Sequence, residues 1–281
     1  MRKTLEEPDL VPGAHGLHWT PRLGNPLQTA VVLFTFRSIV RSRQHRLASA
    51  LCAALILSTA LPWLRIELSS QAPLSMTSEF LAATFIIVSL AVLGLRGIFS
   101  LPISLTANWV LQTTHLSPTE KYVAATRSTL LLLAVAPSWV IAALLSIRLR
   151  PSHYVAIHLV VLALVGWLFV EISLINFYKV PFTCSWLPGK VHIQVLFGCS
   201  LVVLVVFGLT CSELELPALG SLTRCIFMVL LLAGCCIALS RFNNHRARSA
   251  QLYFEELEPE VITSLGIGPL PQQTHSTALP R

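Results

Sequence analysis

The side chain best able to do chemistry in this chain is the carboxylate of Glu171, which stands inside a long apolar run at 154–178. An ionised group at the centre of a bilayer costs roughly 2.5–3.5 kcal/mol, so Glu171 should face protein or water rather than lipid. If the helix ends at Tyr178, Glu171 lies about 10 Å inside that end. At that depth Glu171 is expected either to bind a proton, a cation or a basic substrate, or to form a structural ion pair with Arg96 or Lys179. A third interpretation is a protonated carboxyl bonded to a neighbouring helix.

A second group of candidate residues lies in and after the polar segment 179–190. Cys184 and the nearby His192 could form a nucleophilic thiol with a base that deprotonates it. Lys190, at the end of the segment, could bind a lipid phosphate. The alternative is a rigid loop that only connects the helices on either side, and its two prolines and one glycine favour that interpretation.

Six apolar runs must position these residues. The length of each run is close to the roughly 20 residues that a helix needs to cross a bilayer. The runs are 47–64, 80–99, 129–147, 154–178, 191–210 and 219–240. Hydrophobic residues make up 54% of the chain and charged residues only 12%, whereas soluble domains carry roughly 25% charged residues. The sequence therefore predicts an all-α polytopic membrane helix bundle with about six transmembrane helices in one domain, 47–240.

The segments outside the bundle are two tails and two interfacial helices. Residues 1–25 are expected to be a disordered tail, and 241–281 a cytoplasmic C-terminal tail. Residues 26–46 predict a basic amphipathic helix that anchors the topology or docks a cytoplasmic partner. Its apolar face comprises Val32, Phe36, Ile39 and Val40, and its polar face Arg37, Ser38, Arg41, Ser42 and His45. A second interfacial helix is expected near Leu105 to His115.

The basic residues predict the orientation of the bundle. If the spans are placed as above, sixteen of the 20 Lys and Arg residues lie on the side of the two tails. The four on the other side are Arg65, Arg148, Arg150 and Arg224. Basic residues concentrate on the cytoplasmic side of membrane proteins, so both termini should be cytoplasmic. The net charge of +7 then reflects topology and attraction to an anionic bilayer, and we expect no nucleic-acid partner.

One segment carries a resemblance. Residues 182–190 read F-T-C-S-W-L-P-G-K, which resembles the F-T-C-S-[YW]-L-P-G-K stretch of a group of uncharacterised bacterial polytopic membrane proteins. Residues 34–46 resemble the basic segment before the first span of those proteins. The resemblance implies a multi-pass protein of the cell inner (cytoplasmic) membrane, and it implies no activity.

Missing motifs narrow the function. The chain has no G-x-x-x-x-G-K-[ST] motif, so a nucleotide-driven role requires a separate ATPase subunit. Asp9 is the sole aspartate, which argues against a paired-aspartate metal site, and we expect neither metal nor cofactor. The sequence favours a transport-type or accessory membrane subunit, similar to an export permease. The alternatives are a membrane enzyme that acts on a lipid through Glu171 or Cys184 and His192, and a scaffold that recruits a soluble partner through its C-terminal tail.

Overall fold

A computed structural model describes residues 24–69, 74–101, 118–183 and 193–252, and these residues are helical apart from short connections and one pair of two-residue strands. The long helices are α1 (Pro26–Arg41), α2 (Arg43–Ser69), α3 (Ser78–Ile98), α5 (Thr119–Leu130), α6 (Ala136–Leu145), α7 (Ser152–Ser173), α8 (Ile193–Leu219) and α9 (Leu222–Ser249). Strands β1 (Leu74–Ser75) and β2 (Leu149–Arg150) pair in parallel. The prediction of an all-α bundle is confirmed.

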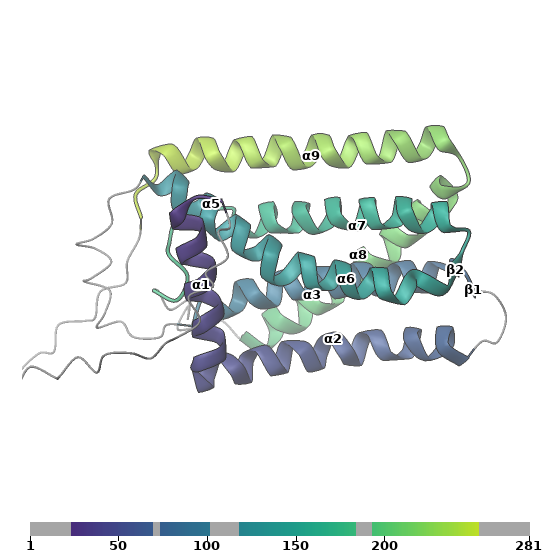
Figure 1. Ribbon diagram of the computed structural model, residues 1–281, viewed down its shortest axis with the longest axis horizontal. Helices are drawn as coiled ribbons and strands as arrows, with labels where there is room; N and C mark the ends of the chain where they lie inside the picture. Colours follow the sequence, from purple (N-terminus) through teal and green to yellow (C-terminus); the bar gives the residue numbers. More distant parts are fainter. Residues whose placement is uncertain (1–23, 70–73, 102–117, 184–192, 253–281) are drawn as a thin grey trace, which may run out of the picture.

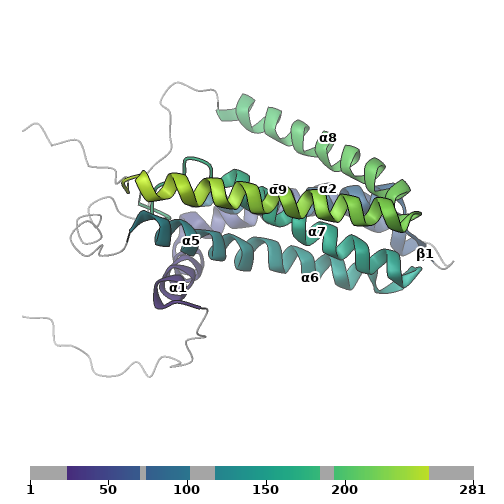
Figure 2. The same cartoon turned by 90° about the horizontal axis from the view of Figure 1, so that it is seen from above.

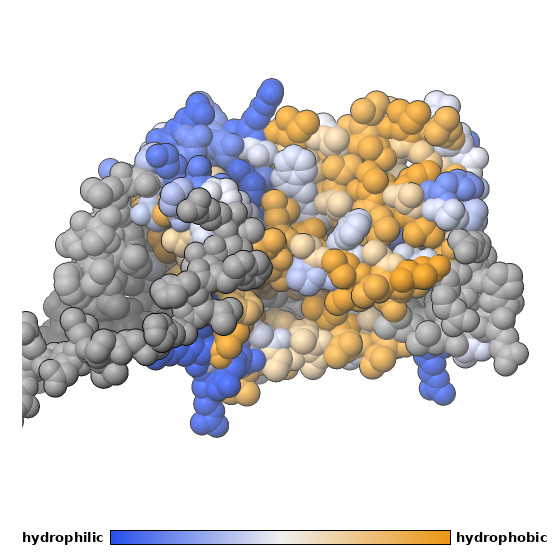
Figure 3. Space-filling view, in the orientation of Figure 1, coloured by the Kyte–Doolittle hydropathy of each residue, from blue (hydrophilic) through white to orange (hydrophobic). Residues whose placement is uncertain are grey.

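The long helices lie side by side, and α1 lies across one end of them (Figure 1). The start of α1 and the end of α9 lie at this end, which we call the α1 end; the strands lie at the opposite end, which we call the strand end. Six helical segments are long and apolar enough to cross a membrane, with α5 and α6 counted as one. Figure 3 shows apolar side chains gathered over the middle of the bundle and hydrophilic ones at both ends. The chain is therefore a multi-pass membrane protein.

Helix α3 forms the centre of the bundle, where α2, α7 and α8 pack around it. Lipid tails provide no hydrophobic drive for helices to associate, so small residues that allow close approach matter more than in water. A Cβ atom on Gly208 of α8 would lie 2.6 Å from Ile86 of α3. A Cβ atom on Gly166 of α7 would lie 2.7 Å from Val135. These two glycines therefore set how closely α8 and α7 approach their neighbours.

The third crossing contains an irregularity near Pro137, where the sequence predicts a kink because proline lacks the backbone N–H of a regular helix. The chain forms a π-helical turn at Leu131–Val135 and then enters α6 with Pro137 in its first turn. Turns of this type are a common cause of helix bends.

Two predicted spans end at the wrong residues. The apolar run 191–210 predicts a span that ends at 210, followed by a loop that carries Glu213 and Glu215, but α8 runs from Ile193 to Leu219, so both residues are in a helix. Glu215 is buried against other helices, with 1% of its surface exposed. The run 154–178 corresponds to α7, which ends five residues early at Ser173.

The segment 26–46 is not one helix, because the backbone is extended at Ser42 and a new helix begins at Arg43. Helix α1 packs on α5 and α2. The buried residues of α1 are Val31, Val32, Thr35 and Ser38. Phe36 and Val40, predicted on the apolar face, are 52% and 53% exposed, whereas Ser38, predicted on the polar face, is buried. The prediction for Ser38 was wrong because α1 packs on protein, where small Thr and Ser side chains fit closely. The second interfacial helix falls outside the described residues.

Candidate functional site

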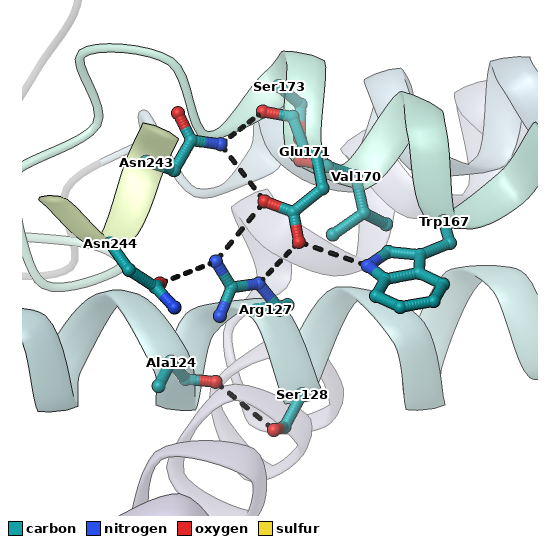
Figure 4. A network of polar contacts seen from close by, with 9 residues as sticks. All are labelled: Ala124, Arg127, Ser128, Trp167, Val170, Glu171, Ser173, Asn243 and Asn244. Atoms are coloured by element: carbon teal, nitrogen blue, oxygen red, sulfur yellow. Dashed lines mark hydrogen bonds and ion pairs between the residues drawn. The ribbon is translucent and has the colours of Figure 1, made fainter. Parts of the chain in front are cut away.

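The carboxylate of Glu171 is fully buried in the last turn of α7, at the α1 end. Its nearest charged partner is Arg127 of α5, whose Nε lies 2.6 Å from Oε1 and whose Nη2 donates to Oε2 at 3.2 Å. Trp167, one turn earlier on α7, donates its indole N–H to Oε1 at 3.0 Å. Asn243 of α9 donates to Oε2 at 2.9 Å and to the Glu171 backbone carbonyl at 2.8 Å. Figure 4 shows these side chains converging on one carboxylate.

We call this group, together with Asn244, the Glu171 cluster. A carboxylate has about four lone-pair positions, and in this cluster three N–H groups donate hydrogen bonds to it, while Arg127 Nε adds a close ion-pair contact without hydrogen-bond geometry. Asn244 accepts a further hydrogen bond from Arg127 at 2.9 Å. The charge of Glu171 is therefore balanced and both of its carboxylate oxygens accept hydrogen bonds, so the cluster holds α5, α7 and α9 together at this end.

The predicted partners of Glu171 were wrong, since the cation that pairs with it is Arg127 and not Arg96. Arg96 lies over the ring of Phe177, 4.1 Å from its centroid, and donates to the backbone carbonyl of Ser173 at 3.0 Å. Lys179 lies 5.8 Å from the centroid of the same ring. Arg127 was missed because it stands two residues before the predicted run 129–147 and was assigned to water.

A second buried cluster lies toward the strand end of α7. His158 is fully buried, and its Nδ1 lies 3.1 Å from both carboxylate oxygens of Glu215 on α8. Its Nε2 lies 3.0 Å from the hydroxyl of Thr84 on α3. The rings of Phe80 and Phe85 pack around the imidazole. These contacts define the His158 cluster, which holds α3, α7 and α8 together.

The sequence alone does not predict the His158 cluster, because hydropathy places Glu215 in a loop and a lone histidine near the end of a span is typical of a packed or interfacial residue. One signal was present. Glu215 lies only five residues after the end of the run 191–210, a distance that one and a half helical turns would cover. A histidine and a carboxylate at the same depth on neighbouring spans favour a pair.

Both clusters use α7, but they use different faces of it. Thirteen residues separate His158 from Glu171, which is about 20 Å along a helix axis. The same spacing rotates the two side chains roughly 140° apart around the helix. Helix α7 is therefore bonded to α5 and α9 at one end and to α3 and α8 at the other.

An apolar groove of about 290 Å³ lies between α2, α3 and α8. Figure 2 shows α8 slanting away from the other helices toward the α1 end. The groove is lined by leucines and by Gly94 and Gly97, with Cys52 and Ser200 as its polar side chains. It offers a surface for an acyl chain and brings no acid and base together.

Three of the candidate residues, Cys184, Lys190 and His192, lie outside the described residues, so their proposed chemistry stays a prediction. Within the described ranges, no three His, Cys, Asp or Glu side chains gather closely enough to hold a metal ion. No protein-family model, no curated protein and no solved structure matches this chain.

Proposed function

We propose that this chain is a transport-type membrane protein in which the two clusters are gates at opposite ends of α7. The observation that carries the proposal is the pair of ionisable clusters buried within membrane-spanning helices. Ionisable residues inside membranes are costly and typically mark ion and substrate pathways. A bundle that served only as a scaffold would gain at least as much stability from apolar side chains in these places.

The proposed cycle follows from which helices each cluster connects. The Glu171 cluster closes the α1 end by bonding α7 to α5 and α9, and the His158 cluster closes the strand end by bonding α7 to α3 and α8. If one cluster opens while the other stays bonded, α7 moves with one set of helices and a path opens at one end only. Transporters commonly alternate access by moving one group of helices against another in this way.

Both termini are placed in the cytoplasm in this proposal, in the cytoplasmic membrane of the cell. Support comes from the basic residues, because Arg37, Arg41, Arg43, Arg246 and Arg248 all lie on helices at the α1 end. The strand end carries Arg224 and the arginines of the β2 region.

The orientation predicts the activity of a phosphatase reporter that folds only outside the cytoplasm. A reporter fused after Arg248 should be inactive, and one fused near Ser70 should be active, because five crossings, an odd number, separate the two positions. Measured phosphatase activity in whole cells checks this, with expression of each fusion as the control. The opposite pattern would reverse the side assigned to each gate.

Helix α1 is the proposed docking surface for a partner, either the separate ATPase or another membrane subunit. Phe36, Arg37, Val40 and Arg41 are exposed on it, while its buried face packs on α5. Because α5 carries Arg127, a partner that displaced α1 would act on the Glu171 cluster through one helix.

The gate proposal predicts reciprocal changes in cysteine labelling. Cys225 of α9 lies within electrostatic reach of Glu215, and Cys236 of the same helix within reach of Glu171; their exposed fractions are 4% and 0%. Glu215→Gln should raise the labelling rate of Cys225 from the strand end about tenfold or more, because loss of one partner from a buried ion pair costs about 3–5 kcal/mol. The same change should slow labelling of Cys236 from the α1 end.

The measurement uses a membrane-impermeant maleimide on vesicles of each orientation and proteins that retain a single cysteine. Glu171→Gln should give the reverse pattern, with Cys236 faster and Cys225 slower. Glu213→Gln is the matched control, since Glu213 is exposed on the same helix as Glu215. Faster labelling of both cysteines in either variant would mean that the clusters only stabilise the fold, and the gate proposal would fail.

A further inference from the structure

We infer that the His158 cluster binds one proton when the strand end is closed and releases it when that end opens, so that H⁺ is the ion coupled to this gate. This inference rests on the proposed gate and names its coupled ion. The argument depends on the hydrogen-bond partners of the two imidazole nitrogens and on the charges around them.

The first step concerns Nε2 of His158. The hydroxyl of Thr84 lies 2.7 Å from the backbone carbonyl of Leu81, a distance at which it donates its single proton there. The same hydroxyl then has only lone pairs to offer Nε2 at 3.0 Å. Nε2 therefore carries a hydrogen and donates it to Thr84.

The second step concerns Nδ1. This nitrogen lies 3.1 Å from each oxygen of Glu215, a symmetric contact that fits one N–H shared between the two oxygens of an ionised carboxylate. A bare Nδ1 lone pair facing an ionised carboxylate would be repulsive. The closed cluster therefore holds a proton between His158 and Glu215, and with it the pair has no net charge.

The third step concerns the other charged and titratable groups near the cluster. Among the described side chains toward the strand end they are the exposed Arg65 of α2, Glu79 of α3, His153 and Tyr154 of α7, Cys211 and the exposed Glu213 of α8, and Arg224 and Cys225 of α9. Helix α6 and the π-helical turn contribute none. Glu79, His153 and Arg224 are exposed, so among the described side chains the imidazole is the cation that balances Glu215 inside the bundle.

Loss of the proton opens the gate for an electrostatic reason. When Nδ1 gives its proton to water entering from the strand end, a neutral imidazole and an uncompensated carboxylate remain. Removing one charge from a buried pair leaves the other strongly destabilised, so His158 and Glu215 separate and the carboxylate becomes hydrated. The closed form holds one more proton than the open form, and closing is therefore favoured as pH falls.

Proton coupling also distinguishes two forms of the proposed function. A proton gradient would move the gate at the strand end without nucleotide hydrolysis, whereas a separate ATPase would act from the α1 end. Histidine suits the first form because its charge changes between about pH 5 and 8 in water.

The test is the pH dependence of Cys225 labelling at the strand end, in a protein that keeps only this cysteine. Each rate is divided by the rate of the unfolded protein at the same pH, which removes the ionisation of the thiol itself. Between about pH 5.5 and 8.5 the ratio should rise with pH, by at most tenfold per unit as one proton requires. His158→Gln should abolish the dependence, and His153→Gln, an exposed histidine of the same helix, should preserve it.

Thr84→Val provides a second variant that nearly preserves shape. It removes the acceptor of the Nε2 hydrogen and weakens proton binding, so the rise should move to lower pH with the same slope. The proton site would be overturned if the labelling ratio of the unsubstituted protein did not change with pH. It would also be overturned if the pH dependence of this ratio persisted in His158→Gln. Reciprocal labelling without pH dependence would refute this inference alone, and pH dependence without reciprocal labelling would refute the gates alone.

Discussion

Replacing Glu171 by leucine should lower the free energy of unfolding by about 3–5 kcal/mol, and adding Arg127→Met should restore most of that loss. The single change leaves the Arg127 guanidinium, whose side chain is only 14% exposed, without its counter-ion. The double change removes both charges and replaces them with apolar side chains of similar size. Asn243 keeps its hydrogen bond to the Glu171 backbone carbonyl in both variants.

Stability would be measured by denaturation of the purified protein in detergent, as a full double-mutant cycle. The control pair is Glu120 and Arg248, which join the same two helices α5 and α9 near the surface with 3.0 Å between Arg248 Nε and Glu120 Oε2. Glu120→Gln should change stability little, because exposed ion pairs contribute little. If the losses of unfolding free energy caused by Arg127→Met and Glu171→Leu simply add in the double variant, the two residues do not act as a pair.

Alanine at Gly208 should destabilise the bundle by about 1–3 kcal/mol, although the same substitution usually stabilises a helix. The new Cβ would lie 2.6 Å from Ile86 and 3.2 Å from the backbone carbonyl oxygen of Ala82, and a backbone atom cannot rotate away. Gly166→Ala should also destabilise, because its Cβ would meet Val135 and Val88 at 2.7 and 3.2 Å. Helices α8 and α7 would have to move outward from α3.

The matched control for these glycines is Gly234 of α9, where an added Cβ meets nothing within 4 Å. Gly234→Ala should raise stability by up to about 1 kcal/mol, since glycine is that much less favourable than alanine inside a helix. The measurement is the unfolding midpoint of the three variants in the same detergent. Equal shifts at Gly208 and Gly234 would contradict the close packing of α8 on α3.

The sequence predicts the number of crossings correctly because lipid imposes a simple condition on each. A helix in the membrane must be long and apolar, and hydropathy detects both properties. It also predicts that Glu171 avoids lipid, since the cost of an isolated charge does not depend on the fold. The side chains that meet Glu171 depend on how α5, α7 and α9 pack, and no local pattern contains that information.

Three residues of the two clusters were missed in the sequence analysis for the same reason. Arg127, Glu215 and Asn243 all lie just beyond the ends of apolar runs, where hydropathy assigns them to water. In the fold the helices continue past those ends, and the polar side chains turn inward to meet partners 44 to 72 residues away in the chain. At these three helix ends, hydropathy alone therefore does not predict that the polar side chains turn inward.

The Glu171 cluster also bears on how the chain enters the membrane during synthesis. Arg127 and Glu171 belong to consecutive crossings, so their ion pair can form within a single helical hairpin. Each helix alone would bring a charge into lipid, whereas the hairpin brings a neutral pair, and we expect the two crossings to leave the translocation machinery together. Asn243 belongs to the last of these crossings, so its hydrogen bond to Glu171 forms only after α9 has been synthesised.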